Sequence, residues 1–226
     1  MTPLTFPTSR EVIFRNREEA AHLLAKTLSP SAGDHPLILG IPRGGVPMAA
    51  TIAATLHGDL DVVLVHKIGA PMQPELAIGA VDESGAIHIS HIADDIGISH
   101  PDIEELARKQ HHVLKKRRHD YTPDQRPINS AGRIVIIVDD GSATGETMSA
   151  ALRSIRMNKP SKLIAAMAVA PPETVHDLEN LADEVVCLQT PLSFAAVGQF
   201  FGDFSPVEDK EVIKLLKSFP HSPAVE

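Results

Sequence analysis

Tryptophan, tyrosine and cysteine are almost absent from this chain. Its 226 residues include no tryptophan, one tyrosine and one cysteine. The single cysteine, Cys187, can form neither an intrachain disulfide nor a cysteine-rich zinc site, and a free thiol suits a reducing cytoplasm. Apolar residues make up 43% of the chain, so global disorder is excluded and one sizeable core can be buried.

Long apolar runs and an excess of positive charge are also missing. The longest apolar stretch, residues 163–170, is far too short to cross a bilayer. The first thirty residues contain no apolar segment typical of a signal peptide. A formal net charge of −8 gives no general attraction to nucleic acid or to an anionic membrane. We therefore expect a cytoplasmic protein that binds neither.

Glycine and proline, by contrast, are frequent and separate short apolar segments. Buried strands are predicted over 37–41, 61–66, 133–138, 162–169 and 184–188. Helices are predicted over 17–28, 46–56, 101–121, 145–157, 171–181 and 209–218. This alternation predicts an α/β fold, a mostly parallel sheet with helices on both faces. In such sheets ligands bind beyond the carboxyl ends of the strands.

The sharpest motif is the segment 138–148, VDDGSATGETM, which follows a predicted strand and opens a helix. Free backbone N–H groups at the start of a helix bind phosphate, and hydroxyl side chains add further donors. The residues expected to surround the phosphate are Gly141, Ser142, Ala143, Thr144, Gly145, Glu146 and Thr147. A Walker A loop is excluded, because only three residues separate the two glycines and no lysine follows the second.

Two aspartates, Asp139 and Asp140, stand just before this loop. Ionised carboxylates can accept hydrogen bonds but cannot donate them, and their negative charge would be repelled by a phosphate. They suit the hydroxyl groups of a ribose, or a water molecule bound to Mg²⁺. The alternative for the whole segment is an ordinary capped helix with Asp-Gly as turn chemistry.

The segment 138–148 resembles the phosphoribosyl pyrophosphate loop of type I phosphoribosyltransferases, with an apolar strand, two acidic residues and a small-residue loop ending in Thr-Gly-x-Thr. Segments 40–47, GIPRGGVP, and 65–71, VHKIGAP, resemble a bacterial branch of this family without an assigned base. The likeness covers about residues 10–215. It implies a Mg²⁺-dependent glycosyltransferase of nucleotide metabolism that passes ribose 5-phosphate to an unidentified nucleobase or amine and releases pyrophosphate. The alternative is a regulatory protein that senses phosphoribosyl pyrophosphate without turnover.

The resemblance also implies roles for residues outside the loop. Arg43, Gly44 and Gly45 match the family's pyrophosphate loop, and Lys67 matches a basic residue that approaches the same group. Asp139 and Asp140 would hold the ribose hydroxyls. Mg²⁺ would have no direct protein ligand and would be held through the substrate, with these two carboxylates as the candidates to assist. Together with Mg²⁺, the two cations would neutralise the leaving pyrophosphate.

Two further parts of the site are expected around this centre. Residues 68–85 are interpreted as a mobile loop that closes over the reaction, in which Glu75, Asp82 and Glu83 have no assigned role. Ala143 stands where 6-oxopurine enzymes of the family commonly carry Asp, which disfavours such a purine as acceptor.

The chain 1–226 is expected to form one domain with two parts. Residues 10–190 would form the core, and residues 191–226 with the N-terminal segment would form a hood over the acceptor. Phenylalanines are expected to supply flat faces there, with core packing as the alternative for each: Phe194, Phe200, Phe201 and Phe204. Dimers are common in the family, so a homodimer is a candidate state. The basic run 115–118 is interpreted as a solvated helix face, with contact to the site or to a polyanion as the alternative.

Overall fold

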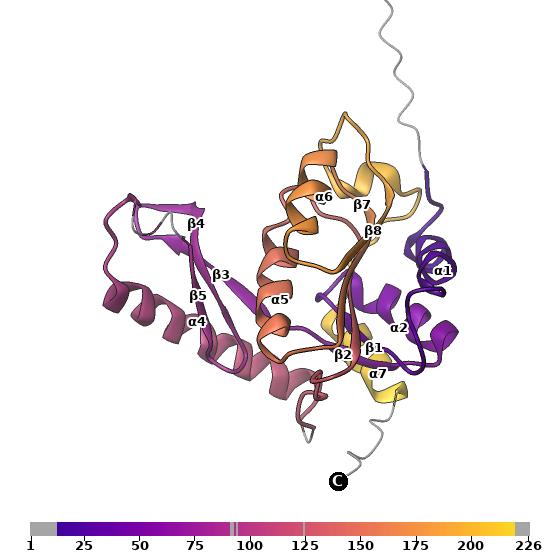
Figure 1. Ribbon diagram of the computed structural model, residues 1–226, viewed down its shortest axis with the longest axis horizontal. Coiled ribbons are helices and arrows are strands. Elements are labelled where there is room, and N and C mark those ends of the chain that lie inside the picture. Colours follow the sequence, from indigo (N-terminus) through magenta and orange to yellow (C-terminus); the bar gives the residue numbers. More distant parts are fainter. Residues whose placement is uncertain (1–12, 91–92, 94, 124, 220–226) are drawn as a thin grey trace, which may run out of the picture.

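The computed structural model describes residues 13–90, 93, 95–123 and 125–219, with only the backbone described at residues 74 and 75. Its centre is a five-stranded sheet in the order β2-β1-β6-β7-β8, and every neighbouring pair is parallel (Figure 1). The strands are β1 Leu37–Gly40, β2 Asp59–Val62, β6 Ile134–Asp139, β7 Lys162–Val169 and β8 Glu184–Gln189. The expected α/β fold with a mostly parallel sheet is confirmed.

Helices cover both faces of the central sheet because its strands are apolar on both sides. In β6, Ile136 and Val138 pack on one face, whereas Val135 and Ile137 pack on the other. The first face is covered by α1 (Arg17–Leu28) and α2 (Gly45–Leu56), and the second by α5 (Glu146–Met157) and α6 (Pro172–Glu179). Among the described helices, none has the length and apolar character needed to cross a membrane.

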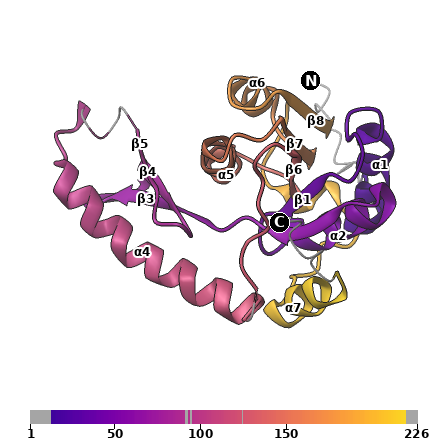
Figure 2. The same ribbon diagram turned by 60° about the horizontal axis from the view of Figure 1, so that its bottom comes forward.

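A second sheet, antiparallel and ordered β3-β4-β5, projects sideways from the central sheet (Figures 1 and 2). Its strands are β3 Val65–Ala70, β4 Gln73–Asp82 and β5 Ile87–Ile89. The long helix α4 (His100–Tyr121) packs along it, and the side of α5 contacts β3. These three strands and α4 are called the arm below.

Two predictions from the sequence are wrong in the region of the arm. The strand expected over 61–66 is divided between β2 in one sheet and β3 in the other, and residues 68–85 are mostly a hairpin rather than a loop. The glycines there serve close strand pairing, since a Cβ at Gly79 would lie 2.5 Å from the His88 carbonyl oxygen. Apolar residues of both strands, Ile68 and Ile78, are buried with the helix residue Ile103.

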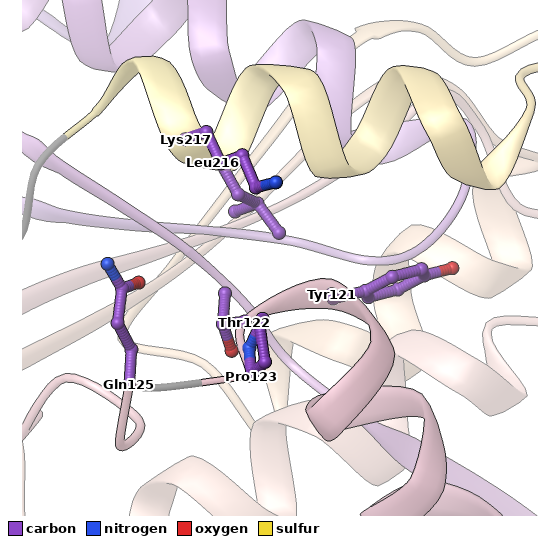
Figure 3. A pocket seen from close by; sticks show the side chains of 6 residues that line it. All are labelled: Tyr121, Thr122, Pro123, Gln125, Leu216 and Lys217. Atoms are coloured by element: carbon purple, nitrogen blue, oxygen red, sulfur yellow. The ribbon is translucent and has the colours of Figure 1, made fainter.

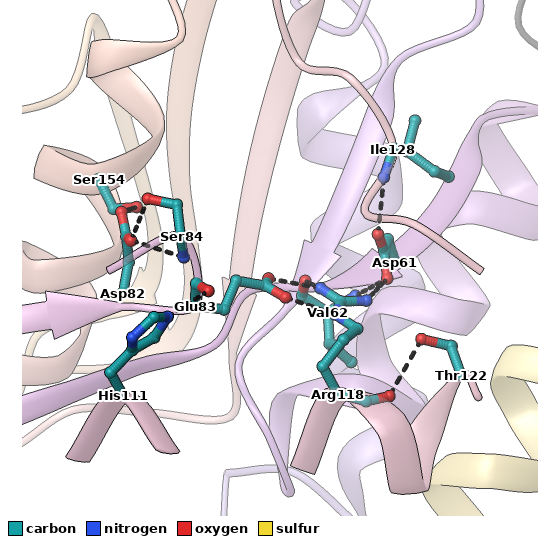
Figure 4. A network of polar contacts seen from close by, with 10 residues as sticks. All are labelled: Asp61, Val62, Asp82, Glu83, Ser84, His111, Arg118, Thr122, Ile128 and Ser154. Atoms are coloured by element: carbon teal, nitrogen blue, oxygen red, sulfur yellow. Dashed lines mark hydrogen bonds and ion pairs between the residues drawn. The ribbon is translucent and has the colours of Figure 1, made fainter. Parts of the chain in front are cut away.

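A buried cluster of charges joins the arm to the central sheet (Figure 4). Arg118 near the end of α4 donates hydrogen bonds to Asp61 of β2 and to Glu83, which follows β4. Asp82 accepts a hydrogen bond from Ser154 of α5 at 2.6 Å. The predicted solvated face holds for residues 115–117, which are exposed, but is wrong for Arg118, which is buried. Asp82 and Glu83 therefore hold the arm in place; the Glu75 side chain lies outside the described residues.

The start of the described chain pairs with the segment that follows β8, beside the carboxyl edge of the central sheet. Phe14 and Phe201 form an isolated parallel bridge, and the Gly202 N–H donates to the Phe14 carbonyl at 2.8 Å. After β8 the chain forms the short helix η1 (Val197–Phe200) and then α7 (Asp209–Ser218), which lies near the end of α4 (Figure 2). Residues 1–12 and 220–226 of the expected hood lie outside the described residues. The division into core and hood stays a prediction.

Candidate active site

The central strands β1 and β6 lie side by side, and the chain leaves them in opposite directions. From β1 it continues to β2 at one edge, whereas from β6 it continues to β7 toward the other. A crevice at the carboxyl ends of two such strands is where open α/β sheets bind ligands. The parts of the predicted segments 40–47 and 138–148 that follow the strands, residues 41–45 after β1 and 140–147 after β6, lie at this edge. We call them the glycine turn and the helix-start loop.

The glycine turn packs directly against the end of β6. A Cβ added at Gly45 would overlap the Val138 carbonyl oxygen, and one added at Gly44 would overlap the Asp140 carboxylate. Only a residue without a side chain permits this approach, because both neighbours are held by the sheet. The peptide bond between Pro42 and Arg43 is cis, and Arg43 itself is exposed at the tip of the turn.

Asp139 is the last residue of β6, and Asp140 follows it directly. The Asp140 N–H donates to Asp139 Oδ1 at 2.9 Å, and Asp140 Oδ2 accepts from Arg17 Nε at 2.8 Å. Removal from water raises the pKa of Asp139 well above its ordinary value, and the neighbouring charge of Asp140 raises it further. Burial also raises the pKa of Asp140, and the Arg17 guanidinium opposes that rise.

Arg17 is a member of the site that the sequence did not indicate. It lies 123 residues before Asp140 and is the first residue of α1. The sequence predicted only the start of the helix at this position. In the structure, the Asn16 side chain caps that helix by accepting a hydrogen bond from the Glu19 N–H at 3.0 Å. No local pattern distinguishes Arg17 from an exposed helix residue.

The helix-start loop is held open by its own polar groups. Ser142 Oγ accepts from the Gly145 N–H at 2.9 Å, and the Thr174 hydroxyl donates to the Ala143 carbonyl at 2.8 Å. Gly145 has a φ of +74°, the left-handed region that favours glycine, and the helix begins at the next residue. Ala143, Thr144, Glu146 and Thr147 are exposed toward solvent. The loop therefore presents the start of α5 to the crevice, as a phosphate site requires.

Lys67 reaches the helix-start loop from the arm. It lies within β3, not at the end of a central strand as the sequence suggested, and its Nζ pairs with Glu146 Oε2 at 3.0 Å. Lys67 and the loop are therefore neighbours. Arg43 is exposed at the glycine turn, and no contact of its side chain with the loop is found among the described residues. The structure thus brings Lys67 to the loop.

Comparison with known proteins identifies the family. The model of the phosphoribosyl transferase domain matches residues 10–202, most of the chain. This chain belongs to the phosphoribosyltransferase family. It is 39% identical over 207 residues to a Mycobacterium tuberculosis protein named "Putative phosphoribosyl transferase", covering 90% of this chain and 46% of that protein. The chain thus spans about half the length of the curated relatives it matches.

Two other proteins extend this comparison. The crystal structure of TT1426 from Thermus thermophilus has a TM-score of 0.84 and 42% identity, and the match covers 92% of this chain and 99% of that one. The "Bifunctional protein PyrR" of Corynebacterium efficiens is 29% identical over 153 residues, which cover 66% of this chain and 62% of that protein. The resemblance to phosphoribosyltransferases seen in the loop motif is confirmed over nearly the whole chain.

The four phenylalanines expected near the acceptor do not form one open face. Phe200 and Phe201 are each only 5% exposed and belong to the core, because Phe14 packs on Phe201 with ring centroids 5.3 Å apart. Phe204 is half-buried beneath the Arg17 guanidinium, whose Cζ lies 3.8 Å from the ring centroid. The expectation of four acceptor faces is therefore wrong for two of them.

Two cavities flank the crevice without including its loops. One of about 110 Å³ lies between the end of α4 and α7 (Figure 3). It is lined by Tyr121, Thr122, Pro123, Gln125, Leu216 and Lys217. The other, of about 360 Å³, lies between the start of α1, α2 and α7, and Arg17 forms part of its wall.

The raised pKa of Asp139 predicts a gain in stability when its charge is removed. A carboxyl whose pKa is raised by folding destabilises the fold above that pKa and no longer does so at lower pH. We expect Asp139→Asn to raise Tm at pH 7.5 by roughly 2–4 °C, the shift that about 1 kcal/mol makes in a chain of this size. The gain should shrink as the pH falls toward 4, followed by calorimetry.

Asp140→Asn is the matched comparison, because burial also raises the pKa of Asp140 but the Arg17 guanidinium opposes that rise. Its gain in Tm should therefore be smaller than that of Asp139→Asn. Equal changes in the two variants would contradict the assignment of the unfavourable charge to Asp139.

Proposed function

We propose that the chain binds phosphoribosyl pyrophosphate in the crevice and, with Mg²⁺, transfers ribose 5-phosphate to a nucleobase or amine with release of pyrophosphate. The observation that carries this proposal is the meeting of three parts at one sheet edge. They are the start of α5 after the helix-start loop, the paired carboxylates that end β6, and the glycine turn against them. They match, in order, the phosphate, the ribose and the pyrophosphate of one substrate.

The 5-phosphate would lie at the helix-start loop, where backbone N–H groups and the hydroxyls of Thr144 and Thr147 are exposed. Glu146 carries a negative charge beside this position, and its ion pair with Lys67 reduces the repulsion of a phosphate. Asp139 and Asp140 would accept hydrogen bonds from the two ribose hydroxyls. The raised pKa values of both carboxyls reflect partial removal from water, which strengthens those hydrogen bonds.

The leaving group would lie against the glycine turn. Gly44 and Gly45 let the backbone of the turn lie directly against Asp140 and the end of β6, and Lys67 and Arg43 would supply positive charge beside it. The exposed position of Arg43 at the turn would allow its side chain to reach the crevice.

The donor set fits a Mg²⁺ ion brought by the substrate. Mg²⁺ prefers hard oxygen ligands and keeps several waters, so it binds through one or two carboxylates together with substrate phosphates. Asp139 and Asp140 would hold it from the protein side, and the ion would neutralise charge on the pyrophosphate. The negative field of the two carboxylates favours the positive charge that develops on the ribose ring as the bond from C1 to pyrophosphate breaks.

Calorimetric titration with phosphoribosyl pyrophosphate and Mg²⁺ tests this proposal. We expect binding by the unaltered protein, and at least about tenfold weaker binding by the double variant Asp139→Asn/Asp140→Asn, which loses charge-assisted hydrogen bonds. Asp183→Asn is the control, because Asp183 pairs with Arg156 outside the crevice. Absence of binding by the unaltered protein would refute the proposal.

Pyrophosphate release distinguishes the enzyme from a sensor that binds without turnover. Nucleobases and small amines would be screened with phosphoribosyl pyrophosphate and Mg²⁺, and release with one acceptor would identify the second substrate. Intact binding with no release across a broad panel would favour the sensor. The cytoplasmic location and the homodimer stay predictions.

A further inference from the structure

Arg17 connects the carboxylate pair to a segment that follows the fold's last strand. We propose that Arg17 is a positioning residue, which fixes Asp140 for the ribose and couples occupation of the crevice to the segment 203–206. The inference rests on the proposed function, because it takes Asp140 to bind the ribose. It adds a link between the substrate site and the part of the chain expected to cover the acceptor.

The guanidinium of Arg17 is engaged on two edges and one face. Its Nε donates to Asp140 Oδ2 at 2.8 Å, its Nη1 donates to the Ser205 carbonyl at 2.8 Å, and its face lies on the Phe204 ring. The side chains of Arg17 and Asp140 are only 14% and 12% exposed. A planar cation with fixed donor directions is suited to hold two partners and an aromatic ring at once.

The position of Arg17 in its helix is unfavourable for a positive charge. It is the first residue of α1, where the helix dipole favours acidic side chains, and Glu18 and Glu19 follow it in the same turn. Local helix stability therefore does not explain an arginine there. The buried ion pair with Asp140 does explain it.

Asp140 lies between Arg17 and the glycine turn. Its Oδ2 is held by Arg17 on one side and by the close approach of Gly44 on the other. The carboxylate is therefore fixed against the turn proposed to bind pyrophosphate, and ionised oxygens have further lone pairs for a ribose hydroxyl. Without Arg17, nothing of opposite charge among its described partners would hold Asp140 beside Asp139.

The segment 203–206 is tied to the same place from its other side. The Asp203 N–H donates to the Arg15 carbonyl at 2.8 Å, and the Asp203 carboxylate accepts from the Ser205 hydroxyl. Residues 203 and 205–207 line the cavity of about 360 Å³ whose wall includes Arg17. A change at Asp140 on substrate binding therefore reaches this segment through one side chain.

Affinity measurements with three variants test the positioning role. We expect Arg17→Met to weaken calorimetric binding of phosphoribosyl pyrophosphate with Mg²⁺ about tenfold, and Arg17→Lys to restore part of the loss. Arg15→Met is the control, because Arg15 is exposed and pairs only with Glu19 among the described side chains. Unchanged affinity in Arg17→Met, with binding by the unaltered protein, would refute the inference and leave the proposed function standing.

Hydrogen exchange measured by mass spectrometry tests the coupling itself. In the unaltered protein, phosphoribosyl pyrophosphate should slow exchange over residues 200–206, and in Arg17→Met this slowing should disappear even at saturating substrate. Slowing that persists in Arg17→Met would overturn the coupling. Where Arg17→Met does not fold, Arg17→Lys takes its place, with reduced slowing expected. If the unaltered protein binds no substrate, the proposed function fails first, and the contact is tested by faster exchange over 200–206 in the unliganded variant.

Discussion

Arg118→Met is expected to lower the free energy of unfolding by about 3–5 kcal/mol, because it leaves the buried Asp61 carboxylate and the mostly buried Glu83 carboxylate without their cation. The guanidinium donates to Asp61 at 2.6 Å and to both oxygens of Glu83 at 2.6 Å, and it also reaches the Val62 carbonyl at 2.9 Å (Figure 4). Burial favours its neutral form, but the hydrogen bonds to Glu83 and the charge of Asp61 outweigh burial and raise the pKa of Arg118.

The stability lost in Arg118→Met should depend on pH, and the direction of that dependence tests whether unpaired carboxylates cause it. Burial already raises the pKa of Glu83, and Arg118 opposes that rise, so removing the cation raises this pKa further. A carboxyl with a raised pKa in the folded state gains relative stability as the pH falls. The difference between Arg118→Met and the unaltered protein should therefore narrow between pH 7.5 and pH 5, measured by urea unfolding with circular dichroism.

Lys116→Met, on the same helix but exposed, is the matched control and should change stability by less than about 0.5 kcal/mol. A loss of the same size in both variants would show that helix propensity, not the buried charges, sets the effect. Arg118 lies in α4, Asp61 in β2 and Glu83 just after β4, at the root of the arm. The loss of stability should therefore appear with faster hydrogen exchange in β3 and β4.

Local patterns were sufficient for the central sheet except β2, and for the two loops at its carboxyl edge. The Ile/Val run of β6 and the Thr-Gly-x-Thr loop after it can be recognised within about a dozen neighbouring residues. The structure brings this loop and the glycine turn to one edge of the sheet. The contact of Arg17 with Asp140 spans 123 residues, so no local pattern could indicate it.

The arm shows two different reasons for a wrong prediction. Glycines in β3 and β4 were interpreted as loop residues, although at Gly79 the missing side chain permits strand pairing. For Arg118 a signal was present: it falls on the same helical stripe as Leu114 and Tyr121, both buried. A basic run was interpreted by its charge, whereas the helical period decides which of its members is buried.

Gly45→Ala is expected to disable the crevice with only a moderate loss of stability. The added Cβ would overlap the Val138 carbonyl oxygen and lie 3.1 Å from the Asp139 Cα, and both belong to the backbone of a central strand. That strand is paired on both sides, so the glycine turn must move instead. Overpacking of this kind costs about 1–3 kcal/mol. A shift of about 1 Å in a binding group can cost roughly a hundredfold, so we expect a similar loss in affinity for phosphoribosyl pyrophosphate.

Gly132→Ala is the control that separates the loss of stability from the loss of substrate affinity. Gly132 has a φ of +70°, so alanine is strained there, but a Cβ would meet no atom within 4 Å and the residue precedes β6 rather than following it. This control should lose stability, by about 1 kcal/mol, while substrate affinity measured by calorimetry stays unchanged. If Gly45→Ala binds substrate as the unaltered protein does, the glycine turn is not the pyrophosphate site. A loss of affinity in Gly45→Ala alone would instead locate binding at the turn, because both variants share the added methyl group and only one of them displaces the turn.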